Sequence, residues 1–101
     1  MLKRTFAAAV MLACVPLAHA DDFCDKIAET AKVAMSARQQ ELPLKDFINA
    51  TRKHSPEKSK LMEPIIFEAY KRPLVQGKEA KASAIQEYSN LAYMGCMKTS
   101  K

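Results

Sequence analysis

Apolar side chains from residue 21 onward recur at spacings of three and four, a pattern typical of amphipathic helices. No stretch alternates between apolar and polar positions as a strand would. The first predicted helix starts at Asp21 or Asp22, either of which can cap its amides, and ends near residues 38–40. A second, shorter helix has Pro43 in its first turn. The apolar stripes of these two helices comprise Cys24, Ile27, Ala28, Ala31, Ala34 and Met35 in the first, and Leu44, Phe47, Ile48 and Thr51 in the second.

A third helix is predicted to start at Ser55-Pro56-Glu57, which combines a capping hydroxyl, a proline that needs no amide partner and an acid at the helix N-terminus. Pro64 lacks the amide that would bond to the carbonyl of Lys60, so we expect a break near residues 62–64. Arg72-Pro73 ends the segment. The predicted buried side of this third helix consists of Leu61, Met62, Ile65, Ile66 and Ala69.

The last predicted helix runs from Lys78 to Lys98 and places Cys96 in its final turn, whereas Cys24 lies in the first turn of the first helix. The two cysteines can meet if these helices lie side by side and antiparallel. We therefore expect an all-α fold, a small bundle of four or five helices whose first and last members are antiparallel and joined by a disulfide. The last helix presents one broad apolar face of Ala84, Ile85, Tyr88, Leu91, Ala92, Gly95 and Cys96, with Glu79, Ser83, Glu87 and Asn90 opposite.

The first twenty residues have the pattern of a cleaved signal peptide. Lys3 and Arg4 precede an apolar run over residues 6–15, and Ala18-His19-Ala20 forms a small-x-small cleavage site. The run is far shorter than the roughly 20 residues that a membrane span needs. Cleavage after Ala20 would leave residues 21–101 as a single periplasmic or secreted helical domain. The alternative is lipidation at Cys14, which would tether the protein to a membrane.

Export would make a structural disulfide of the two remaining cysteines, because thiols oxidise in that compartment. Closing a loop of about 70 residues stabilises a fold by roughly 4 kcal/mol in the chain-entropy model. The chain carries 16 Lys and Arg against 11 Asp and Glu; two of these cations belong to the leader, so the remainder has a net charge of +3. Because charges of both signs are interleaved, a nucleic-acid surface is not expected.

Few residues suggest chemistry. After cleavage the only histidine is His54, expected in an exposed loop, and no nucleophile, base and orienting group can be assigned, so we expect no catalytic site and no cofactor. Met94 and Met97 form a Met-x-x-Met step on one helix, and thioethers bind Cu(I). These two residues are weak metal candidates, and packing is the simpler interpretation.

Four residues break the amphipathic pattern and are the candidates for an interaction surface. Arg38 projects from the apolar stripe of the first helix, so its guanidinium must reach outward or meet a carboxylate such as Glu68. Val33, Phe67 and Met94 point away from the predicted stripes. If they converged on one surface, they would form a binding site for a partner. Oligomeric state stays open.

Cys24, the stretch at residues 35–40, Ala69-Tyr70 with Pro73, and the segment from Tyr88 to Cys96 together resemble small uncharacterised exported proteins of proteobacteria and their phages. The resemblance implies a two-cysteine helical framework and brings no known activity. The leading functional hypothesis is a periplasmic interaction module, without catalytic activity, that binds another envelope protein. The alternatives are a periplasmic stress chaperone and, with less support, a copper carrier.

Overall fold

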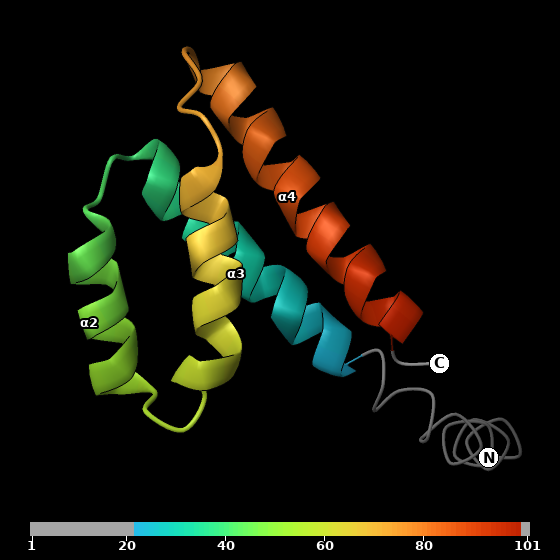
Figure 1. The fold of residues 1–101 in the computed structure, drawn as a ribbon. Coiled ribbons are helices and arrows are strands. Elements are labelled where there is room, and N and C mark those ends of the chain that lie inside the picture. The colour runs from blue at the N-terminus through green and yellow to red at the C-terminus, as the bar shows by residue number, and fades with distance from the viewer. Residues whose placement is uncertain (1–21, 100–101) are drawn as a thin grey trace, which may run out of the picture.

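The computed structural model describes residues 22–99, and this part of the chain consists of four helices without a strand (Figure 1). Helix α1 covers residues 22–39, α2 Leu44–His54, α3 Ser59–Lys71 and α4 Lys78–Thr99. The expected all-helical bundle is confirmed at four helices. Predictions for the leader, including Cys14, Ala20 and the cap at Asp21, fall outside the described residues. None of the described helices is both long enough and apolar enough to cross a membrane.

Helices α1 and α4 lie side by side in opposite directions, as predicted. A disulfide joins Cys24, in the first turn of α1, to Cys96, near the end of α4, with 5.6 Å between their Cα atoms. At the other end of the pair, the Nζ of Lys81 donates a hydrogen bond to the backbone carbonyl of Gln39 at 3.1 Å. These two links lie at opposite ends of both helices, so they fix the antiparallel register along the whole contact.

Small side chains on α1 let the other helices approach closely. Ala31 and Ala34 are fully buried, and the hydroxyl of Ser89 on α4 donates to the carbonyl of Ala28 at 3.0 Å. Ser89 is itself buried, and its short side chain makes this bond where a larger one would separate the helices. The predicted stripes of the first two helices are confirmed. The buried cluster consists of Ala31, Ala34, Met35, Ile48, Ile66, Ala69 and Tyr88.

Helix α1 ends in a Schellman motif. The amide of Leu42 bonds to the carbonyl of Ala37 and the amide of Glu41 to that of Arg38, both at 3.0 Å. Glu41 occupies the left-handed position of this motif, with φ of +62°, where glycine is the usual residue. The backbone therefore turns sharply here, and Pro43 follows as the N-cap residue of α2.

The start of α3 differs from the prediction. Ser55 caps the end of α2, its amide bonding to the carbonyl of Thr51 at 2.8 Å. Its own carbonyl accepts bonds from the amides of Lys58 and Ser59, so residues 56–58 form a turn and α3 begins only at Ser59. His54 is likewise the last residue of α2 and not part of a loop, although it is exposed as expected.

The break expected near residues 62–64 is wrong, because α3 continues through Pro64 without interruption. Pro64 and Lys60 are both exposed, so the carbonyl that loses its amide partner lies on the solvent side of the helix, where water can bond to it. On the opposite side, Ser59 before Pro64 and Ile66 and Ala69 after it are buried, so both halves of α3 pack against the core.

Helix α4 matches its predicted range to within one residue, but its buried face is narrower than predicted. Tyr88 and Ser89 are buried, whereas Leu91 and Gly95 are exposed. The outward face of polar residues is confirmed. Helices α1 and α3 thus cover only part of the apolar side of α4, and the uncovered part borders the candidate site.

Candidate partner-binding groove

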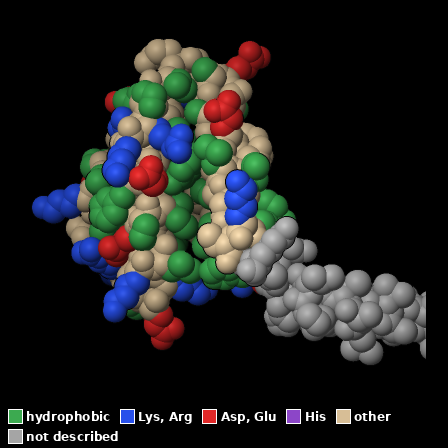
Figure 2. All heavy atoms as spheres, turned by 45° about the vertical axis from the view of Figure 1, so that its right-hand side comes forward, with side chains coloured by type: hydrophobic (Ala, Val, Ile, Leu, Met, Phe, Trp, Pro, Cys, Tyr) green, Lys and Arg blue, Asp and Glu red, His purple; other side chains and the backbone are tan. Residues whose placement is uncertain are grey.

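An open groove of about 480 Å³ lies between α3 and α4 and extends to the first turns of α1. We call it the α3–α4 groove. On the face of the molecule shown in Figure 2, hydrophobic side chains gather along the middle, with charged side chains to either side. The lining residues are Phe23 and Ile27 from α1, Leu61, Pro64, Ile65 and Glu68 from α3, Arg72 after it, and Tyr88, Leu91, Ala92, Gly95, Cys96 and Thr99 from α4.

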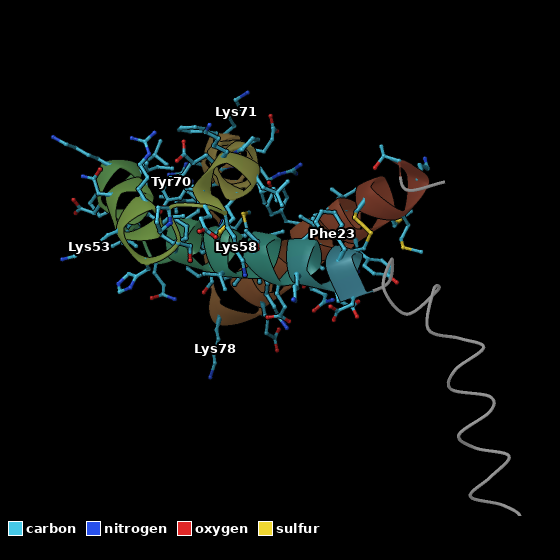
Figure 3. All side chains as sticks on the ribbon, turned by 90° about the horizontal axis from the view of Figure 1, so that it is seen from below. Phe23, Lys53, Lys58, Tyr70, Lys71 and Lys78 are labelled. Carbon is cyan, nitrogen blue, oxygen red and sulfur yellow. A yellow bond between two sulfur atoms is a disulfide. The ribbon has the colours of Figure 1, made fainter. Side chains whose placement is uncertain are left out.

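Three large apolar side chains in the groove are about half exposed: Phe23 at 46%, Leu61 at 49% and Leu91 at 53%. Each comes from a different helix. Figure 3 shows Phe23 at the start of α1, on the same side of the molecule as the disulfide. Single exposed apolar residues are common, but three that converge on one groove mark an interaction surface.

Tyr88 forms the floor of the groove and is held by the backbone of α3. Its hydroxyl donates a hydrogen bond to the carbonyl of Ile65, and its ring is buried. Burial raises the pKa of Tyr88, and the neighbouring Arg72 cation opposes this shift. The hydroxyl therefore stays neutral at physiological pH and keeps α3 and α4 at a fixed separation.

Arg72 lies at the end of the groove where α3 stops. Its guanidinium carbon sits 4.7 Å from the centre of the Tyr88 ring, a cation–π geometry. The Nε atom of Arg72 is buried and has no hydrogen-bond partner. Glu68 lines the groove as well, but its carboxylate accepts a bond from the Nζ of Lys71 at 3.2 Å. Within residues 22–99, Arg72 therefore makes no ion pair.

Gln39, at the end of α1, fixes the connection between α3 and α4. It is only 3% exposed, and its Nε2 donates to the carbonyl of Pro73 at 3.1 Å while its Oε1 accepts from the amide of Val75 at 3.0 Å. This one side chain thus makes two bonds from α1 to the linker. Because the linker sets where α4 begins, Gln39 also positions α4 against α3 and hence the groove.

Of the two alternatives predicted for Arg38, an outward position or contact with a carboxylate such as Glu68, the second is not found, and Arg38 bonds to a backbone carbonyl. Its Nε donates to the carbonyl of Arg72 at 2.9 Å, and its guanidinium carbon lies 5.8 Å from the centre of the Tyr70 ring. The carboxylate of Glu68 instead accepts a bond from the Nζ of Lys71. Arg38 is half-buried, and its hydrogen bond satisfies the carbonyl of Arg72, the C-cap residue of α3.

The remaining candidates for an interaction surface are exposed but lie on three different helices. Val33, Phe67 and Met94 have exposed fractions of 55%, 43% and 56%. Val33 lines a second groove, between the end of α1 and the start of α2, together with Leu42 and Phe47. Neither Phe67 nor Met94 borders that groove, and none of the three lines the α3–α4 groove.

The structure leaves copper binding by Met94 and Met97 as a prediction. Met94 is exposed and Met97 is half-buried. Within the part of the chain that the structure describes, no group of three or more His, Cys, Asp or Glu side chains is arranged to hold a metal ion.

Sequence reasoning did not single out the residues that make the α3–α4 groove. The apolar periodicity predicts that Leu61 and Leu91 are buried, and it gives Phe23 no role. The available signal was the width of the apolar face on the last helix, which exceeds what its neighbours can cover in so small a bundle.

Comparisons of the chain with protein-family models, curated proteins and solved structures find no match. The resemblance to small exported proteins therefore stays a prediction, and the functional argument rests on the geometry of the groove.

Proposed function

We propose that the protein is a non-catalytic binding module that holds an amphipathic helix of another envelope protein in the α3–α4 groove. The observation that carries this proposal is the convergence of Phe23, Leu61 and Leu91, each about half exposed, on one open groove. Burying such side chains against a partner removes apolar surface from water and is the main driving force of association.

The dimensions of the groove favour a helical partner. Along α3 the groove extends from Leu61 to Arg72, which at 1.5 Å per residue corresponds to roughly 16 Å, or three turns of a docked helix. Three turns present anchor side chains at positions i, i+3 or i+4, and i+7, the usual spacing of helix-in-groove recognition. An extended peptide would instead use an open strand edge, and residues 22–99 contain no strand.

The disulfide supports a location outside the cytoplasm. Bonds such as Cys24–Cys96 persist in oxidising compartments, so the bridge fits an extracellular or periplasmic protein. The predicted signal peptide leads to the same compartment. An envelope protein is therefore the partner class that the chain would meet.

The test is affinity capture from envelope extract with matched variants. Leu91→Asp places a charge in the groove, whereas Met94→Asp places the same charge at a similarly exposed position of α4 outside it. A partner recovered by the wild-type protein and by Met94→Asp, but not by Leu91→Asp, would support the proposal. Recovery of no specific protein, or equal recovery by both variants, would contradict it.

The exposed apolar groove also supports the second hypothesis, a stress chaperone that binds unfolded clients. Suppression of the aggregation of a model client at acid and neutral pH tests this function directly. A chaperone would protect many unrelated clients and lose activity in Leu91→Asp. Absence of protection at every pH would remove this candidate.

A further inference from the structure

Arg72 is the charged group of the groove whose partner is missing within the described residues. Its side chain lines an otherwise mostly apolar surface and makes no ion pair within residues 22–99, and only the Nε of its three guanidinium nitrogens is enclosed without a hydrogen-bond partner. A guanidinium binds a carboxylate through two parallel hydrogen bonds, and the two terminal nitrogens of Arg72, which are not enclosed, can supply them. These features define a site for a carboxylate that the partner would supply.

Two acidic side chains that line the same cavities as Arg72 do not fill this role. Glu68 precedes Arg72 by four residues and lines the same groove, but the two side chains form no ion pair. Glu68 pairs with Lys71 instead. Glu87 borders the small cavity on the other side of Arg72, and these two side chains form no ion pair.

Arg72 is also held in place before any partner arrives. Its guanidinium packs over the ring of Tyr88, and its carbonyl accepts the bond from Arg38. An arginine fixed in this way loses little conformational freedom when it pairs, which favours a specific contact over a diffuse attraction.

We propose that the helix bound in the α3–α4 groove carries an Asp or Glu side chain that pairs with Arg72. This inference rests on the proposed function and adds a position to it. Arg72 lies at one end of the groove, while Phe23 and Cys96 lie toward the other. The acid therefore belongs at the end of the partner's apolar stripe, about one turn beyond the last anchor.

The experiment uses two synthetic amphipathic peptides of about four helical turns, with leucines at positions i, i+4, i+7 and i+11 and blocked termini that remove the end charges. The peptides differ only at the position one turn beyond the last leucine, which is Glu in one and Gln in the other. Binding is measured by fluorescence anisotropy to the wild-type protein, to Arg72→Met and to Lys60→Met. Lys60 is an exposed α3 cation outside the groove, so its variant controls for net charge.

The Glu peptide should bind the wild-type protein and Lys60→Met about tenfold more tightly than the Gln peptide, and this preference should vanish in Arg72→Met. Arg72→Lys, which keeps the charge and loses the fork, should retain only part of the preference. Circular dichroism establishes that each variant is folded, and Arg72→Lys alone decides the question if Arg72→Met is not.

The other outcomes separate the two proposals. Equal binding of both peptides by the wild-type protein, abolished by Leu91→Asp, would overturn the role of Arg72 while leaving the groove as a docking site. Binding of neither peptide would count against the helix-binding function itself. Arg72-dependent binding of sodium dodecanoate without peptide binding would overturn the inference in favour of a fatty acid.

Discussion

Replacing Gln39 by leucine should destabilise the protein markedly, although the substitution introduces an apolar residue of similar size at a buried position. The variant loses the bonds from Gln39 to the carbonyl of Pro73 and from the amide of Val75. The bond between Lys81 and the Gln39 backbone carbonyl is unaffected, because it does not involve the side chain.

The size of the effect follows from what each group can do afterwards. Pro73 is exposed, so its carbonyl can bond to water, and the net loss there is about 0.5–1 kcal/mol. Val75 is half-buried, so its amide loses its acceptor where water reaches poorly, at a cost of about 1–3 kcal/mol. We expect a total loss of about 1.5–4 kcal/mol, a large share of the roughly 5–15 kcal/mol that stabilises a typical domain.

Urea unfolding followed by circular dichroism measures this loss, and hydrogen exchange at the Val75 amide reports the local effect. Gln40→Leu is the matched control, because Gln40 is the exposed next residue and its side chain donates to the hydroxyl of Ser36 within the same helix end. It should change stability by less than about 0.5 kcal/mol. Equal losses in the two variants, or unchanged protection of the Val75 amide in Gln39→Leu, would refute the role assigned to Gln39.

Three further predictions concern the bridge, the end of α1 and acid stability. Replacing Cys24 and Cys96 together by alanine should lower the unfolding free energy by about 4 kcal/mol, because the bridge closes a loop of 72 residues and so lowers the entropy of the unfolded chain. A loss below about 1 kcal/mol in urea titration would contradict this entropic contribution. Glu41→Gly should raise the melting temperature and add about 0.5–1 kcal/mol to the unfolding free energy, because glycine accepts the positive φ that Glu41 adopts. The control variant Glu41→Ala should show no such gain. Glu63 accepts two bonds from Arg52, at 2.8 and 2.9 Å, which lower the pKa of Glu63 below its ordinary value of 4.5. A carboxyl with a lowered pKa stabilises the fold at pH values above its ordinary pKa, and this stabilisation is lost as the pH falls through the lowered pKa. The wild-type protein should therefore lose more stability between pH 6 and pH 2 than Glu63→Gln. Parallel pH profiles of the two proteins would exclude this contribution.

The helices and the bridge could be predicted because they depend on local spacing. Periodicity located all four helical segments, and the positions of Cys24 and Cys96 within the first and last of them implied the antiparallel pair. The break expected at Pro64 fails for a reason that spacing does not contain. Whether a proline interrupts a helix depends on whether its orphaned carbonyl faces water or protein, and that is a tertiary property.

The groove could not be predicted because it depends on how far neighbouring helices cover an apolar face. Leu61 and Leu91 have the spacing of core residues, yet each remains about half exposed where α3 and α4 diverge. Gln39 shows the reverse case. Its polar side chain is not part of the predicted apolar stripe, yet it is buried because the backbone of a distant linker supplies its hydrogen-bond partners.

The Cys24–Cys96 bond also determines what proteolysis can do to this molecule. Every connection between the helices, at residues 40–43, 55–58 and 72–77, lies inside the covalent loop that the bond closes. A single cut in any of them leaves two pieces that stay joined, so the nicked protein would migrate intact on an unreduced gel and separate only after reduction. In a compartment that contains proteases, all four helices of a protein cut once would remain in one molecule.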